Sequence, residues 1–160
     1  MKRAVVFYLL VFCVLSAFNP IQSDNIGFYK ALSSDDEAIL DKTLSNLEKE
    51  SPSSKINAYK GVLTMKKAGF VKGVGGKLKT FKRGVQLLDN EISKNPNNAE
   101  YRFLRLTIQE NAPGILNYNK QVDEDREAVV SGYKKLNPEL KSFIVDYAKR
   151  SKVLKESDLK

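Results

Sequence analysis

Apolar residues recur at steps of three and four positions over most of this chain, and most regularly in residues 76–113. In the first half of that stretch the apolar positions fall on one helical face and the lysines on the other: Leu78, Phe81, Val85, Leu88 and Ile92. After a polar turn, a second helical pattern carries apolar residues on two sides, which is more surface than one neighbour can cover. The sequence therefore predicts a helical hairpin, with the apolar face of its first arm buried and its second arm at the centre of the domain.

The rest of the chain follows the same helical spacing, and no segment shows the alternation typical of a strand. Helices are expected over residues 34–50 and 53–69, after Asp123 and after Asn137, with a short turn at residues 26–32. The predicted fold class is all-α, built from antiparallel helical hairpins as a bundle or short stack of about six helices. One domain over residues 24–152 accounts for the length, and residues 153–160 are expected to fray.

The N-terminus has the three parts of a secretory signal peptide. Lys2 and Arg3 form a basic end, residues 4–18 an apolar run, and residues 19–23 a more polar end. We expect cleavage after Ser23, with Ala17 as a second position. The alternative is an uncleaved anchor, although the apolar run is shorter than the roughly 20 residues that span a bilayer. The sequence thus predicts an exported protein, periplasmic or extracellular.

The composition provides few of the side chains that commonly carry out catalysis. The chain has no histidine, and its single cysteine, Cys13, lies in the predicted signal peptide, so the mature protein has no thiolate nucleophile or ligand. Asp123, Asp125 and Glu127 have the spacing of a calcium loop, but Ala128 occupies the position that requires glycine. We therefore expect no metal, no cofactor and no enzyme activity. A hydrolase that uses paired carboxylates is the less favoured alternative.

Residues 51–88 carry nine basic side chains and no acid, within a chain of net charge +8. Such a segment attracts anionic membrane surfaces, acidic polymers or acidic proteins. Nucleic acid is not an expected partner, because no aromatic side chains are interleaved for base stacking. The alternative is a solvated face balanced by acids elsewhere, such as Asp35, Glu37 and Asp41. The candidate anion- or partner-binding residues are Lys66, Lys67, Lys72, Lys77, Lys79, Lys82 and Arg83.

Gly73, Gly75, Gly76 and Lys77 suggest a phosphate-binding loop, but Val71 and Leu78 stand where that motif needs glycine and a hydroxyl residue. We therefore interpret this segment as a hinge, or as a site where a simple anion binds to backbone amides.

Arg102 and Arg105 lie three positions apart on one face of the second arm. On so apolar a helix these charges need contact with solvent or with acids, and the nearest candidate in sequence is the acidic cluster from Asp123 to Asp125 at the start of the next helix. We predict a structural ion-pair network among these four residues. The functional alternative is a pair of arginines that binds a substrate carboxylate.

Residues 87–100, LLDNEISKNPNNAE, resemble the junction between consecutive tetratricopeptide repeats, where one helix ends in a proline-asparagine turn and the next begins. Gly84 and Leu88 stand where that family places a small and a large apolar residue. The resemblance covers about one repeat. It implies packed helical hairpins and a protein-binding module without chemistry of its own. An unidentified protein partner is therefore the first expectation for function.

Overall fold

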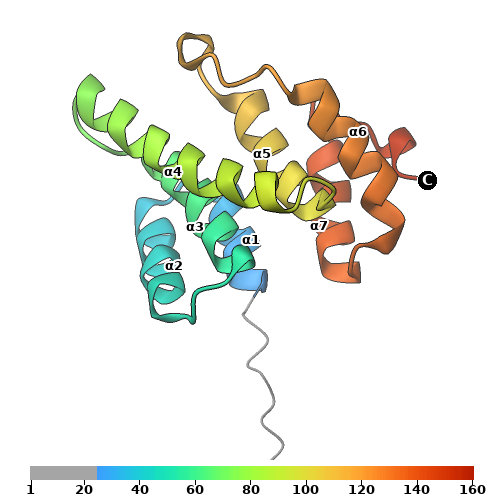
Figure 1. The fold of residues 1–160 in the computed structure, drawn as a ribbon, viewed down its shortest axis with the longest axis horizontal. Coiled ribbons are helices and arrows are strands. Elements are labelled where there is room, and N and C mark those ends of the chain that lie inside the picture. The colour runs from blue at the N-terminus through green and yellow to red at the C-terminus, as the bar shows by residue number, and fades with distance from the viewer. Residues whose placement is uncertain (1–24) are drawn as a thin grey trace, which may run out of the picture.

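A computed structural model describes residues 25–160; the predicted signal peptide, residues 1–23, lies outside them. The described part contains only helices and no strand, which confirms the all-α fold class. Figure 1 shows their arrangement. The α-helices are α1 (Asn25–Ser33), α2 (Glu37–Lys49), α3 (Ser54–Lys67), α4 (Val74–Lys94), α5 (Ala99–Asn111), α6 (Val122–Gly132) and α7 (Pro138–Ala148). Three short 3-10 helices follow α5, α6 and α7 in turn: η1 (Gly114–Leu116), η2 (Tyr133–Lys135) and η3 (Glu156–Asp158).

Side-chain caps explain where most of these helices begin. The first free amides of α2, α3, α5 and α7 donate hydrogen bonds to the side chains of Asp36, Ser53, Asn98 and Asn137 respectively. Such caps satisfy backbone donors that have no partner inside the helix. Helix α4 instead follows Gly73, whose φ of 75° suits glycine and lets the chain turn sharply into the helix.

Helices α3 and α4 pack more extensively than any other pair, and two glycines allow their close approach. A Cβ atom added to Gly84 would lie 2.6 Å from the Gly61 carbonyl oxygen, and one added to Gly61 would lie 2.8 Å from the Leu88 amide nitrogen. The backbones therefore meet with no side chain between them. Helix α5 likewise pairs with α6, so α4 and α5 follow each other in sequence but each packs mainly on another helix.

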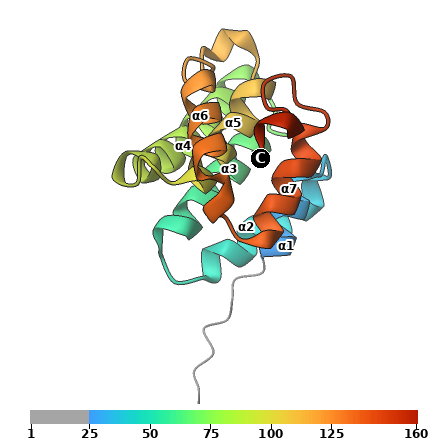
Figure 2. The ribbon, with the colours of Figure 1, turned by 90° about the vertical axis from the view of Figure 1, so that its right-hand side faces the viewer.

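Aromatic side chains join α1 and α7 to the centre of the domain. Phe28 stacks on Tyr59 of α3, and Tyr29 stacks on Phe143 of α7 with ring centroids 4.7 Å apart. Phe143 also meets Phe103 edge to face. Figure 2 shows α7 beside α1 on this side of the molecule. Helix α5 is buried from Tyr101 to Thr107, as expected for the central helix.

The predicted hairpin is wrong in its pairing, since its arms α4 and α5 each pack mainly on another helix, and the structure differs from the sequence predictions at three further places. Residues 26–32 belong to a full helix, α1, because its buried aromatics pack on α3 and α7. The apolar face of α4 is not buried throughout, since Leu78 remains 39% exposed. The C-terminal segment expected to fray is anchored: Leu154 is fully buried, and Asp158 pairs with Arg126 at 2.8 Å.

None of the helices in residues 25–160 combines the length and apolarity needed to cross a bilayer.

Candidate binding groove

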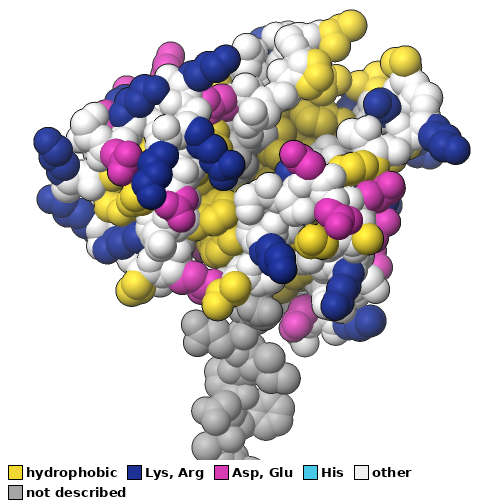
Figure 3. All heavy atoms as spheres, turned by 180° about the vertical axis from the view of Figure 1, so that it is seen from behind, with side chains coloured by type: hydrophobic (Ala, Val, Ile, Leu, Met, Phe, Trp, Pro, Cys, Tyr) yellow, Lys and Arg dark blue, Asp and Glu magenta, His cyan; other side chains and the backbone are white. Residues whose placement is uncertain are grey.

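An open groove of about 790 Å³ lies between the beginning of α4 and the end of α5. One wall is formed by the first turns of α4, and the opposite wall by residues 107–116, which include the end of α5 and η1. Helix α7 closes one part of the wall with Phe143 and Tyr147. In Figure 3 the groove appears as a hollow lined by hydrophobic side chains in the upper right of the molecule.

Large aliphatic side chains project from both lips of this groove. Val74 and Leu78 on α4 are 84% and 39% exposed, and Ile115 in η1 is 93% exposed. Val74, Leu78 and the buried Phe81 follow the helical steps i, i+4 and i+7, so α4 turns one apolar stripe into the groove. Scattered exposed hydrophobic residues are ordinary on a protein surface, but their concentration at one groove indicates a contact surface.

The groove wall also contains a carboxylate, Glu110, that is already fully engaged. It accepts hydrogen bonds from the Tyr147 hydroxyl, from the Ser151 hydroxyl at 2.7 Å and from the backbone amide of Lys152. Burial raises the pKa of Glu110, but these three hydrogen bonds outweigh burial and hold its pKa below the ordinary value. Glu110 is therefore an ionised structural anchor for the segment after α7, and a weak base.

The structure divides the seven predicted anion-binding side chains into two groups. Lys66 and Lys67 face the start of α2: the Lys66 Nζ donates to the Leu32 carbonyl at 2.9 Å and pairs with Asp35 at 3.4 Å. The Lys67 Nζ lies 2.7 Å from Glu37 and 2.6 Å from Asp41. The hydrogen bonds that Lys67 donates to Asp41 and Glu37 raise the pKa of Lys67. These two lysines are thus neutralised locally and do not form part of a free basic surface.

The other five cations lie on or next to the first half of α4, and all are exposed: Lys72, Lys77, Lys79, Lys82 and Arg83. Within residues 25–160 none of them forms an ion pair. Lys77 also lines the groove, together with the exposed Arg150 at the end of α7. Positive charge without a partner therefore gathers beside the apolar lip of α4.

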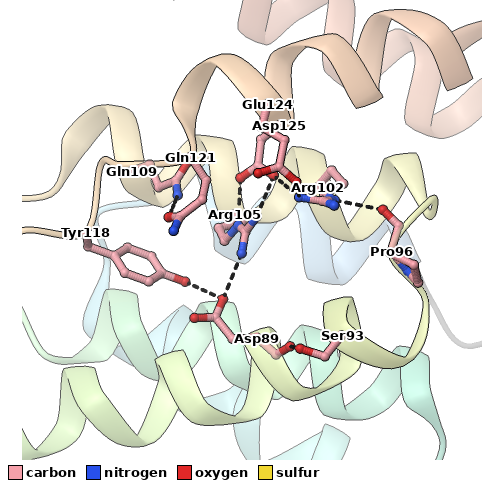
Figure 4. A network of polar contacts seen from close by, with 10 residues as sticks. All are labelled: Asp89, Ser93, Pro96, Arg102, Arg105, Gln109, Tyr118, Gln121, Glu124 and Asp125. Atoms are coloured by element: carbon pink, nitrogen blue, oxygen red, sulfur yellow. Dashed lines mark hydrogen bonds and ion pairs between the residues drawn. The ribbon is translucent and has the colours of Figure 1, made fainter.

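The two arginines of α5 meet at one buried acid, Asp125, the side chain of which is completely shielded from solvent (Figure 4). Arg105 contacts both of its oxygens, and the Arg102 Nη1 lies 3.0 Å from Oδ1. Arg102 also binds Glu124 and the Pro96 carbonyl. Asp123 lies exposed and forms no ion pair in the described chain, so Glu124 takes the place predicted for it.

The network also reaches α4 through Asp89. Asp89 accepts a hydrogen bond from Tyr118 at 3.0 Å and lies 3.4 Å from the Arg105 guanidinium. Every charged group in it has an opposite charge or a hydrogen-bond partner. The arginines are consequently not available to bind a substrate carboxylate, and the network joins α4, α5 and α6.

The sequence predictions missed the two lips of the groove. Val74 stands between two glycines of the segment interpreted as a hinge or a simple anion site, and Ile115 follows the Pro113–Gly114 break outside the predicted helices. For Val74 the available signal was its position four residues before Leu78, which continues the apolar stripe of α4; for Ile115 it was a large aliphatic residue directly after a helix-breaking pair.

Comparisons with protein-family models, with curated proteins and with solved structures find no match to this chain. Within residues 25–160, no group of three or more aspartate, glutamate, histidine or cysteine side chains is placed to hold a metal ion.

Proposed function

We propose that this protein is a binding module of the cell envelope or exterior, and that its groove receives an apolar helical segment of a partner protein. The observation that carries the proposal is the open groove with exposed aliphatic side chains on both lips, Val74 and Leu78 on one side and Ile115 on the other. Amphipathic helices bind in such grooves by inserting apolar anchors spaced along one face. The tetratricopeptide resemblance agrees with this role.

Binding, and not catalysis, is proposed because the groove lacks a poised acid and base. Its carboxylates are Asp35, which is fully exposed and pairs with Lys66, and Glu110, whose pKa is held low. Paired-carboxylate hydrolysis needs one carboxyl group with a raised pKa that can donate a proton. Glu110 does not meet that requirement, because its pKa is lowered, and the Asp35 carboxylate is engaged by Lys66.

The decisive experiment is capture of partners from an envelope extract with the wild-type protein and with the double variant Leu78→Asp, Ile115→Asp. The variant places charges on both lips without touching the core. The proposal expects a partner that wild-type protein retains and the variant loses. A control, Lys42→Glu with Lys134→Glu, changes exposed residues outside the groove lining and should retain it. An identical set of captured proteins for all three would refute the proposal.

A second candidate function, an adaptor for anionic surfaces, is favoured by the five exposed cations of α4 and the loop before it. It expects retention on anionic lipid vesicles that weakens steeply with salt. Lys79→Glu with Arg83→Glu should abolish that retention, because the change reverses two exposed positive charges. Neither residue lines the groove, so the variant leaves the groove unchanged. Retention that does not change with salt would exclude this function.

Export through cleavage of residues 1–23 is part of the main proposal. It is tested by sequencing the N-terminus of the protein recovered from its own cells. A mature chain that begins at Asp24 supports export, whereas an intact Met1 in the cytoplasmic fraction contradicts it.

A further inference from the structure

The charges on the groove are unbalanced once their internal partners are counted. Of its acids, Asp35 pairs with Lys66 at 3.4 Å, and Glu110 is saturated by hydrogen bonds from Tyr147, Ser151 and the Lys152 amide. Of its cations, Lys77 and Arg150 are exposed and form no ion pair in the described chain. The groove therefore presents two exposed cations without an ion-pair partner, whereas both of its acids are held by internal donors.

These two cations come from different elements that contribute to the groove lining. Lys77 lies in the first turns of α4, beside the Val74 and Leu78 stripe, and Arg150 follows α7 near Tyr147. Lys82 also lies next to the apolar stripe of α4, displaced by about 40° around the helix from Leu78, and it is exposed. An occupant that fills the apolar floor would thus meet positive charge at its edges.

The open shape of the groove favours a helix over an acyl chain. A lipid tail needs apolar cover on every side, whereas an amphipathic helix needs it on one face and keeps its other face in water. The groove is open to solvent along one side, as Figure 3 shows.

We propose that the groove selects an acidic amphipathic helix, in which Asp or Glu residues flank an apolar stripe of a partner protein. This inference rests on the function proposed above and adds the chemistry of the partner. The apolar stripe would cover Val74, Leu78 and Ile115, and the flanking acids would pair with Lys77 and Arg150. Charge complementarity of this kind sets specificity and association rate more than it sets total affinity.

The test is a displayed library of helical peptides with one fixed apolar stripe, in which every flanking position is encoded as Glu or Lys with equal frequency. The bait is protein expressed from the full 160-residue reading frame. The inference expects recovered peptides to be enriched in Glu beside the stripe. The variant Lys77→Glu with Arg150→Glu should reverse the bias, while Lys42→Glu with Lys134→Glu should keep it.

Binding measurements on one recovered peptide complete the test. Exchanging its flanking Glu residues for Lys should weaken binding by roughly two- to tenfold, as expected for two partly exposed ion pairs. High salt should remove most of that difference. Circular dichroism of each variant verifies that it is folded.

The outcomes separate the inference from the proposed function. Recovery of helices with no charge bias, or with a Lys bias, overturns the inference and leaves the groove as a binding site. If the wild-type bait recovers no more peptide than the double variant Leu78→Asp, Ile115→Asp does, both the inference and the proposed function are overturned. Displacement of the peptide by vesicles of anionic phospholipid, or by self-association of the protein in sedimentation, assigns the groove to that occupant and overturns the inference.

Discussion

The guanidinium of Arg105 forms a two-point contact with the carboxylate of Asp125, with Nε 2.7 Å from Oδ2 and Nη2 2.7 Å from Oδ1. Asp125 is also the acid that Arg102 reaches, so one fully buried carboxylate compensates two arginines. Planar contacts of this kind fix orientation as well as charge. The relationship determines how the first turn of α6 lies against α5.

We predict that Asp125→Asn destabilises the fold by about 3–5 kcal/mol, because it leaves two largely buried guanidiniums without their shared counter-charge. Urea unfolding followed by circular dichroism measures this difference. Asp123→Asn is the matched control, since it removes an exposed acid from the same helical turn and should cost at most about 1 kcal/mol. Equal small losses for the two variants would show that the buried pair is not structural.

The contact between α3 and α4 gives a second prediction. A Cβ atom at Gly84 would lie 2.6 Å from the Gly61 oxygen and from the Met65 amide nitrogen, so Gly84→Ala must push the two helices apart. We expect a loss of about 1–3 kcal/mol in unfolding free energy, even though alanine favours a helix. Gly75→Ala, also in α4 but with open space around it, should be neutral or stabilising by about 0.4–1 kcal/mol. Stabilisation by Gly84→Ala would contradict the close packing.

A pH dependence follows from Glu110. Because hydrogen bonds in the folded state hold its pKa below the ordinary value of 4.5, the folded protein binds this proton less readily than the unfolded chain. The stabilisation is therefore complete above the ordinary pKa and is lost as the pH falls through the folded pKa. Glu110→Gln should lower the unfolding free energy at neutral pH, and its difference from wild type should shrink as the pH falls below the ordinary pKa of a glutamate.

Urea unfolding at several pH values measures that difference. Glu127→Gln, an exposed carboxylate of α6, serves as the control and should follow the wild-type curve. A Glu110→Gln deficit that stays constant over the whole acid range would contradict the predicted linkage.

The C-terminal segment gives a fourth prediction. Leu154 is fully buried, so Leu154→Ala should cost about 2–5 kcal/mol in thermal or urea unfolding. Lys152→Ala, an exposed change two residues earlier, should stay within about 0.5 kcal/mol of wild type. A frayed tail would instead give no measurable loss for either variant.

Helical spacing was enough to predict the fold class and most helix boundaries, because caps and breaks are local signals. Ser53, Asn98 and the Asn137–Pro138 pair each begin a helix as their chemistry indicates. The approximate position of the ion-pair network was also predictable, since buried arginines need acids and the nearest acidic cluster follows α5 in the chain.

The groove could not be predicted, because it depends on how far α4 extends beyond the helices that pack on it. Leu78 continues the apolar stripe of Phe81 and Leu88 and is indistinguishable from them in sequence, yet it remains 39% exposed. The pairing of Lys66 and Lys67 with the start of α2 is likewise a tertiary contact, which separates them from the free cations of α4. The local spacing of apolar residues does not reveal the exposure of Leu78 or the pairing of the two lysines.

The most direct test of the binding role is chemical-shift mapping of the isotope-labelled protein during titration with a captured partner segment or a selected peptide. The account predicts saturable shifts at the amides of Val74, Leu78 and Ile115, with little change in α2 and α6. Shifts centred on α2 or α6, with the residues of the groove unaffected, would contradict the claim that this groove is the binding site.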